Sequence, residues 1–426
     1  MNKLLELCRE KVVIGAWTIL DDEVQNMRRC RRAKELGLDF LYYDIGARHE
    51  KARTALDNCA ETGLGILAFD GRVSGLTMDH FWCLKDAVAD YIDHPALYGT
   101  VLRDEPGVYD LPRLALLAKE YSRIAPDKLP VINLLPSYAN EDQFNYVDFP
   151  TYIDRCASEL GVPYVSYDHY PLYGNNGRTW VQEKYLSDFE VTSDACRKYG
   201  LDLWYFIQTL AFNRILREPA EQDLRWQIYC ALSFGARVIQ LFTYGSPGDA
   251  SGSTGSEIFE LGLIDRKGEK TTRYDAMQRV LRELRGFDGA YVQYRHAGAM
   301  LNKMGFQPDP AGEEVELVFP TTTMRRRIKH NYLDLAHPLE RFEPIVSVRG
   351  DQPVLAGCFA KESGEKAFTL VNAIDPGLRL RNRAAVEFSG PARLRVYDRG
   401  VASEVEIDGT FAFDLEYGQG LFVEIL

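Results

Sequence analysis

The sequence is poor in the patterns that mark metal enzymes, disulfide-bonded secreted domains and membrane proteins. Its seven histidines are dispersed with no ligand spacing, which argues against a histidine-based metal site. Its eight cysteines lack paired spacing, so we expect free thiols rather than a disulfide framework. No stretch approaches the roughly 18 apolar residues of a membrane span, and residues 1–7 are too charged for a signal peptide. We therefore expect a soluble, cytoplasmic protein without a metal or other cofactor.

Positive charge is also scarce. The chain has 50 Lys and Arg side chains against 62 Asp and Glu side chains, which gives a net charge of −12. This balance argues against nucleic acid or an anionic membrane surface as the main partner. The one basic cluster, residues 325–330, is short and flanked by acidic stretches, so we interpret it as a solvated loop. The sequence leaves the oligomeric state open, a homo-oligomer included.

Apolar sequence, in contrast, is plentiful and regularly spaced. The 426 residues are 46% hydrophobic, enough for a large core and at least two domains. Eight short apolar segments alternate with amphipathic stretches of helical length, which predicts βα units and a parallel sheet. Eight units within about 250 residues are typical of a (β/α)8 TIM barrel. A doubly wound sheet would show a glycine-rich turn after its first strand, and residues 17–22 contain none.

The same patterns divide the chain into three parts. We expect the barrel over residues 1–287, a connecting segment with weak periodicity over 288–347, and an antiparallel β-sandwich over 348–426. The glycine- and serine-rich loop 245–256 follows the eighth strand, and we interpret it as a flap at that end of the barrel. The expected barrel strands are 12–18, 40–45, 65–70, 97–104, 130–135, 164–170, 203–210 and 238–244.

Residues 97–107 carry the most specific chemical signal. Their apolar run predicts a buried strand that ends in Asp104 and Glu105, followed by Pro106, which cannot continue a central strand. Barrel enzymes have their active sites at the carboxyl ends of the strands. A carboxylic acid there can protonate a glycosidic oxygen. The alternative is that both carboxylates cap the helix that follows.

The ends of the other expected strands bring carboxylates, amides, one histidine and aromatic rings to the same rim. This mixture suits a sugar, because its hydroxyls need donors and acceptors while its C–H face stacks on aromatic rings. We take Asp104, Glu105 and Asp168 as the candidate catalytic residues. The candidate substrate-binding residues are Trp17, Asp44, Asp70, Arg103, Asn133, His169, Tyr170, Trp204, Gln208 and Tyr244.

Several of these candidates have a structural alternative. For Asp44 and Asp70 it is a helix cap or an arginine partner. For His169 it is a packed, hydrogen-bonded histidine, and for Trp204 and Tyr244 it is a place among the core aromatics.

Four motifs resemble a known group of barrel proteins. They are Tyr98-Gly99-x-x-Leu102-x-Asp104-Glu105-Pro106, Ile-Asn-Leu-Leu-Pro at 132–136, Ser-Tyr-Asp-His-Tyr-Pro at 166–171, and the stretch 224–236 that leads into Phe-Thr-Tyr at 242–244. The sequence resembles (β/α)8-barrel glycoside hydrolase-like proteins with an Asp-Glu-Pro motif on strand four, which are related to β-galactosidases and agarases. The resemblance implies that Glu105 is the general acid/base and that a nucleophilic glutamate ends strand seven. This sequence has Gln208 there, and a glutamine cannot form a glycosyl ester.

Two functions follow from these observations. The first is a glycoside hydrolase that pairs Glu105 with another rim carboxylate, with Asp168 as the first candidate and Asp104, Asp70 and Asp44 after it. A separation of about 5–5.5 Å predicts retention of configuration, and about 6.5–9.5 Å predicts inversion. The second is a carbohydrate-binding barrel protein that does not hydrolyse its ligand, as Gln208 suggests. A metal-dependent amidohydrolase would need an early histidine pair, and a Ser or Cys triad would need a nucleophile elbow; the sequence has neither.

Overall fold

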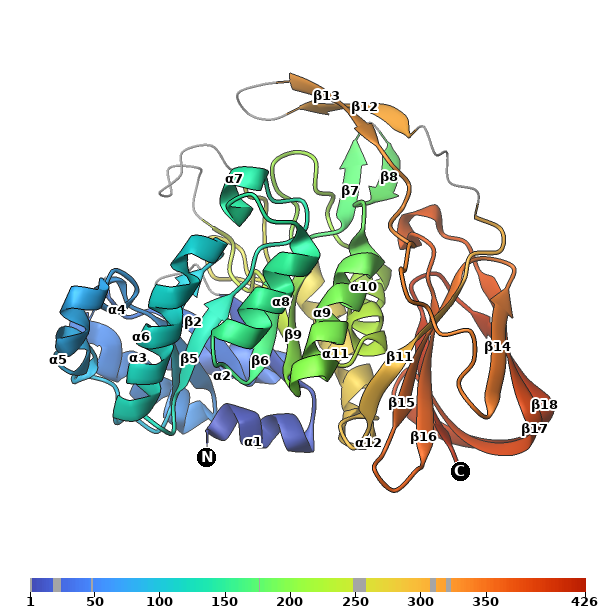
Figure 1. Ribbon diagram of the computed structural model, residues 1–426, viewed down its shortest axis with the longest axis horizontal. Coiled ribbons are helices and arrows are strands. Elements are labelled where there is room, and N and C mark those ends of the chain that lie inside the picture. Colours follow the sequence, from blue (N-terminus) through green and yellow to red (C-terminus); the bar gives the residue numbers. More distant parts are fainter. Residues whose placement is uncertain are drawn as a thin grey trace.

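The computed structural model describes residues 2–17, 24–46, 49–175, 177–247, 258–306, 312–318 and 323–426. Two units lie side by side, a strand barrel surrounded by helices and a curved antiparallel sheet that carries the C-terminus (Figure 1). The predicted TIM barrel with a following antiparallel β domain is therefore confirmed. Within the described ranges, none of the helices is both long and apolar enough to cross a membrane.

The barrel consists of parallel strands that follow one another around it in chain order. The first and last of them pair directly, because β1 lies between β2 and β10. The circle closes between β5 and β6, where the Leu134 N–H donates to the Ser166 carbonyl at 2.8 Å. Each predicted strand is present and ends at the predicted residue or up to two residues before it. The eight strands are β1 (Val13–Trp17), β2 (Phe40–Asp44), β3 (Gly65–Phe69), β4 (Leu97–Asp104), β5 (Leu129–Asn133), β6 (Tyr164–Asp168), β9 (Asp202–Gln208) and β10 (Ala236–Phe242).

Helices cover the outside of the barrel, because apolar residues recur along them every three or four positions. In α6 (Leu111–Ile124), Leu114, Leu117 and Tyr121 belong to the buried stripe. Four-residue helices and 3-10 turns occur in the loops. The helices are α1 (Lys3–Glu10), α2 (Met27–Leu36), α3 (His49–Thr62), α4 (Gly71–Ser74), α5 (Leu84–Val88), α6, α7 (Glu141–Phe144), α8 (Phe149–Glu159), α9 (Tyr185–Tyr199), α10 (Glu221–Ser233), α11 (Thr272–Arg285) and α12 (Asp288–Tyr291), with 3-10 helices η2 (Met78–Cys83), η3 (Val108–Asp110) and η4 (Pro376–Leu378).

Alternation along each strand decides which side chains point into the barrel. On β9, Trp204 stacks on Tyr164 of β6 and Phe206 lies close to Tyr42 of β2, so both point inward. Tyr205, between them, points outward and packs on α9. The inward rings form a continuous aromatic core below the rim, which leaves only the last inward residue of each strand at the open end.

The C-terminal sheet begins before residue 348. The segment 288–347, which we expect to be a connection, contributes β11 (Arg295–Asn302) and β14 (Ile345–Gly350) to this sheet. β14 pairs with one end of the sheet and also contacts β11 and β15 at the other, so the sheet folds over an apolar core. The strand over 382–398 continues past a register shift between Glu387 and Pro391. The remaining strands are β15 (Val354–Ala360), β16 (Lys366–Asn372), β17 (Asn382–Asp398), β18 (Val401–Leu415) and β19 (Gly420–Ile425).

The sheet and the barrel share α10. From Asp223 to Ser233 every residue of this helix is buried, because barrel strands cover one side and β15, β16 and β19 cover the other. The Ser233 and Thr369 hydroxyls are hydrogen-bonded across this interface at 2.7 Å. An added Cβ at Gly357 would overlap the Ser233 backbone, so the two units are in direct backbone contact there.

Two hairpins stand at the carboxyl end of the barrel, β7 (Leu172–Asn175) with β8 (Arg178–Val181) and β12 (Glu313–Val318) with β13 (Thr323–Ile328) (Figure 1). Lys329 N–H donates to Glu183 Oε1 at 3.0 Å, and Arg178 pairs with Glu313, so the second hairpin rests on the first. The basic cluster at 325–330 begins within β13, so its prediction as a loop was wrong; pairing with β12 supplies the backbone partners that a loop would lack. The expected flap at 245–256 lies mostly outside the described residues.

Candidate active site

Two carboxyl groups share one amide at the carboxyl end of β4, β5 and β6. The Asn133 side chain donates from Nδ2 to Asp168 Oδ1 at 2.8 Å and to Asp104 Oδ1 at 3.3 Å. Glu105 follows Asp104 directly, and its charge acts on Asp168. We call Asp104, Glu105, Asn133 and Asp168 the carboxylate cluster. All four are among the residues that the sequence analysis selects.

A bulge in β4 brings the cluster together. The register of β4 against β5 shifts between Val101 and Arg103, so that Asp104 pairs with Asn133 and both side chains meet inside the barrel. Glu105 then takes a left-handed backbone conformation with φ 49°, and its N–H donates to the Asn133 carbonyl at 2.9 Å. Such a conformation is uncommon for a residue with a side chain and is often retained at functional sites.

A chain of hydrogen bonds fixes the orientation of the Asn133 amide. The Ser166 hydroxyl donates to Asn133 Oδ1 at 2.9 Å, and Gln240 Nε2 donates to Ser166 Oγ at 3.0 Å. The Tyr42 hydroxyl donates in turn to Gln240 Oε1. Because the oxygen of Asn133 is occupied by a donor, its NH2 group must face the two aspartates.

The environment of the two aspartates favours their protonated form. Burial raises the pKa of Asp168 well above its usual range, and the charges of Glu105 and Asp104 raise it further, while the Asn133 hydrogen bond lowers it. Asp104 reaches solvent but is surrounded by protein on most sides, and this desolvation raises its pKa to about 6. Asn133 and then Arg103 oppose that rise. Desolvation thus raises the pKa of both aspartates above their usual range.

Aromatic rings occupy the rim on the remaining strands. Trp17 ends β1 and lies 4.6 Å from the Phe69 ring and 6.2 Å from the Phe242 ring, measured between centroids. Phe242 also contacts Tyr170 at 5.0 Å and Phe259 at 6.2 Å. Trp17, Phe69, Phe242 and Phe259 are half-buried, so each keeps part of its ring exposed. The rim thus combines acidic groups on one arc with apolar ring surface on another, as a sugar requires.

Two of the predicted residues have the structural roles named as their alternatives. Asp70 caps α4, forms an ion pair with Arg72 at 2.8 Å and accepts a hydrogen bond from the Tyr91 hydroxyl at 2.9 Å. His169 is buried, and its Nδ1 lies 2.7 Å from Asp188 Oδ2. Both side chains point outward between strands and helices, because they follow an inward residue at the end of their strands.

Three more predicted residues have no exposed surface. Trp204 lies in the middle of the barrel rather than at its rim, since it is the third residue of β9, and its ring stacks on Tyr164 at 3.9 Å. Tyr244 is fully buried beyond the end of β10. Gln208 points inward at the end of β9 but is also fully buried, and the backbone of two loops occupies its amide.

Asp44 and Arg103 are exposed at the ends of β2 and β4. Tyr138, in contrast, was missed by the sequence analysis. Its side chain is 36% exposed, and its pKa is raised well above the usual range by desolvation and then by the charge of Asp168, with a smaller effect from Glu105. It thus lies close to the cluster. The sequence signal for this residue is an aromatic side chain two positions after Pro136, the last residue of the motif at 132–136.

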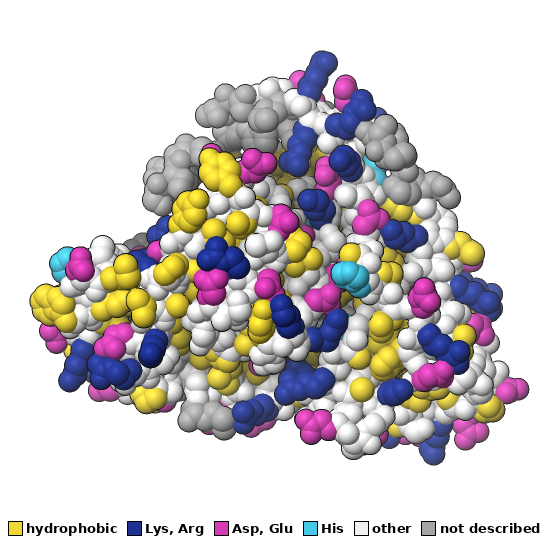
Figure 2. Space-filling view, viewed as in Figure 1, with side chains coloured by type: hydrophobic (Ala, Val, Ile, Leu, Met, Phe, Trp, Pro, Cys, Tyr) yellow, Lys and Arg dark blue, Asp and Glu magenta, His cyan; other side chains and the backbone are white. Residues whose placement is uncertain are grey.

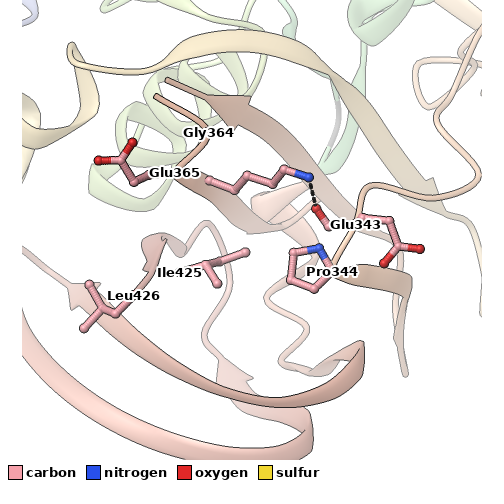
Figure 3. A pocket seen from close by; sticks show the side chains of 7 residues that line it. Glu343, Pro344, Gly364, Glu365, Ile425 and Leu426 are labelled. Carbon is pink, nitrogen blue, oxygen red and sulfur yellow. Dashed lines mark hydrogen bonds between the residues drawn. The ribbon is translucent and has the colours of Figure 1, made fainter. Parts of the chain in front are cut away.

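A hollow of about 540 Å³ lies on the C-terminal sheet next to the C-terminus (Figure 3). The Lys366 ammonium on its wall donates to the Glu343 carbonyl. The Glu343 and Glu365 carboxylates point to opposite sides (Figure 3). Because its carboxylates do not converge, this hollow lacks the paired groups that acid–base chemistry needs. Within the described part of the chain, no group of His, Cys, Asp and Glu side chains could hold a metal ion.

Comparisons with known proteins agree with the fold. No protein-family model and no curated protein matches the sequence. Among solved structures, a family 39 glycoside hydrolase from Bacteroides cellulosilyticus WH2 matches 98% of this chain and 82% of that one, with 11% identity and a TM-score of 0.51. GH5_18 from Streptomyces cattleya matches 65% and 81%, with 12% identity and a TM-score of 0.46. Xylanase 10B from Thermotoga maritima matches 66% and 98%, with 14% identity and a TM-score of 0.42. At 11% identity, the match to the family 39 glycoside hydrolase shows a likeness of fold alone.

Proposed function

We propose that this protein is a glycoside hydrolase whose acid–base pair is Glu105 and Asp168. The observation that carries the proposal is the Asn133 amide, which joins carboxyl groups from two strands beside Glu105. Hydrolysis of a glycoside needs one carboxyl group that carries a proton and a second that is ionised. Neighbouring carboxyl groups that compete for a proton supply both states near neutral pH.

In the proposal the roles within the pair follow the resemblance of the strand-four motif, which implies that Glu105 is the general acid/base. Glu105 is exposed at the tip of β4, and in the proposal it protonates the glycosidic oxygen and later takes a proton from water. Asp168 is 6% exposed and lies deeper in the barrel. It is the second carboxyl group, which in its ionised form attacks the sugar or activates a water molecule. Asp104 stabilises this arrangement through the shared bond to Asn133.

Leaving-group dependence tests these roles. Glu105→Gln should lower turnover of methyl glycosides by about 10²- to 10⁴-fold, with a smaller loss for para-nitrophenyl glycosides, whose leaving group needs no proton. Asp168→Asn should lower turnover of both substrates alike. The opposite pattern would exchange the two roles, and normal turnover of methyl glycosides by Glu105→Gln would refute the assignment. The anomer of the first product, read by proton NMR, separates retention from inversion.

A carbohydrate-binding protein without hydrolytic activity is the second candidate. The observation that favours it is the fully buried Gln208, which occupies the place of the strand-seven nucleophile. A panel of aryl glycosides measured alongside calorimetric titration of the same sugars distinguishes the two. Binding without turnover at any pH between about 4 and 8, the range spanned by shifted carboxyl groups, would favour the second function.

A further inference from the structure

Two tyrosines on the loops that follow β4 and β5 are unusually exposed. The Tyr109 side chain is 76% exposed and Tyr146 is 71% exposed. Tyr109 belongs to η3 on the loop after β4, and Tyr146 follows α7 on the loop after β5. Hydrophobic side chains stand at the surface around α7, next to carboxylates (Figure 2). Exposed rings forgo the stabilisation of burial, and aromatic residues are favoured at binding surfaces.

The two tyrosines are held in place by a shared set of bonds. The Tyr109 N–H donates to Asn145 Oδ1 at 3.1 Å, and the Tyr146 hydroxyl donates to Asp142 Oδ1. Asn145 and Tyr146 both have left-handed backbone conformations, with φ 55° and 67°. Two such residues in succession have a strained backbone, and the hydrogen bonds fix this backbone conformation. The rings are therefore presented by a braced loop.

The same loops contact the segment that carries Glu105. The Tyr152 hydroxyl donates to the Pro106 carbonyl at 2.8 Å and accepts from the Leu135 N–H at 3.2 Å, which joins the loops after β4 and β5. Gly107 lies directly against Asn145, and an added Cβ would overlap that side chain. Tyr109 is thus four residues from Glu105 on a segment that has little freedom to move.

The charges near the two tyrosines limit which sugars can bind there. Asp142 holds the Tyr146 hydroxyl, and Glu141 acts on the same group. The nearby Arg113 is engaged by Asp110 at 2.6 Å. Carboxylates near an exposed ring repel an anionic sugar, whereas a neutral sugar stacks its C–H face on the ring and offers hydroxyls to the carboxylates.

We propose that Tyr109 and Tyr146 form a stacking platform for a neutral sugar unit of an extended chain, adjacent to the unit whose bond is at the carboxylate cluster. The proposal rests on the proposed function and names its substrate class, a neutral oligosaccharide or polysaccharide rather than a small glycoside. The platform is distinct from the aromatic rings of the barrel rim, because both tyrosines come from the loops after β4 and β5, whereas the rim rings end or follow other strands.

Kinetics on substrates of two lengths test the platform. Agarotetraose, xylotetraose and cellotetraose serve as long substrates and para-nitrophenyl monosaccharides as short ones. Tyr109→Ala and Tyr146→Ala should each raise KM for the preferred tetrasaccharide by about 2- to 10-fold, the range for loss of one aromatic contact, with kinetics on the short substrate unchanged. Tyr109→Phe keeps the ring and should behave as wild type. Leu116→Ala, an exposed change on α6, is the surface control.

Calorimetric titration with the same tetrasaccharides separates this proposal from the proposed function. If the wild type binds a tetrasaccharide without turnover, and both alanine variants weaken that binding, the platform is supported and the proposed hydrolase function is refuted. If the wild type hydrolyses tetrasaccharides and both alanine variants do so with unchanged KM, hydrolysis stands and the platform is refuted. Equal affinity of the wild type for a tetrasaccharide and a monosaccharide glycoside would also refute it, as would a Tyr109→Phe variant as impaired as Tyr109→Ala.

Discussion

Replacing Gln208 by glutamate would restore the residue type that the resemblance implies at the end of strand seven. The structure argues that this change destabilises the protein instead of creating a nucleophile. Gln208 Nε2 donates to the Arg217 carbonyl at 2.9 Å and to the Leu210 carbonyl at 3.1 Å, and its Oε1 accepts from the Leu172 N–H at 3.1 Å. The amide thus joins the loops that follow β6 and β9, and the side chain has no exposed surface.

The size of the effect follows from the donors that are lost. An ionised glutamate has no donor, so the buried Leu210 carbonyl and the partly buried Arg217 carbonyl lose their partners. The cost is about 1–3 kcal/mol for each group, and thus at most about 2–6 kcal/mol together. A protonated glutamate keeps one donor, so at low pH the cost falls to about 1–3 kcal/mol. Burial raises the pKa of such a carboxyl group in the folded state. The stability of Gln208→Glu relative to wild type is therefore retained at low pH and lost as the pH rises through that raised pKa.

Urea unfolding followed by tryptophan fluorescence, at about pH 5 and about pH 8 where the carboxyl group differs in charge, measures this difference. Gln278→Glu is the matched control, because its amide donates a single exposed hydrogen bond at 2.8 Å to the Glu35 carbonyl. This surface change should alter the free energy of unfolding by about 0.5 kcal/mol or less. A Gln208→Glu protein with the wild-type unfolding midpoint at the higher pH and increased glycoside turnover would refute the reasoning.

Three further outcomes are expected. Asp168→Asn should reduce turnover by about 10²- to 10⁴-fold with the fold intact by circular dichroism; a substantial residual rate would remove Asp168 from the pair. Burial raises the pKa of Asp104 to about 6, so the wild type loses stability as the pH rises through that value. Asp104→Asn lacks this ionisation, and its melting temperature relative to wild type should therefore rise between about pH 4 and pH 7. Deleting 348–426 should yield aggregated protein, because it uncovers the α10 face that includes Tyr229, whose ring lies against Gly420; each large apolar side chain uncovered costs about 1.5–3 kcal/mol. A soluble, cooperatively folded barrel would contradict this.

Local sequence patterns were sufficient for the barrel. The helix at 111–124 and the helix at 185–199 follow from apolar spacing, and the eight strands follow from short apolar runs between helices of this length. Glu105 and Asp168 could be placed at the rim for the same reason, since a barrel aligns the ends of all its strands. A residue's position within its own strand is a local property, and one sequence suffices to find it.

Partners from different strands were decided only by the tertiary structure. The bulge in β4 puts Asp104, not Arg103, opposite Asn133, and no local pattern marks that shift. Trp204 follows the same apolar pattern as a rim residue but lies three residues into its strand, where Tyr164 covers it. β11 belongs to the C-terminal sheet because it pairs with β15, far along the chain. The sequence by itself determined which elements form and which chemistry they carry to the rim. The packing of distant strands decided which of those side chains meet, because register, bulges and burial depend on contacts between residues far apart in the chain.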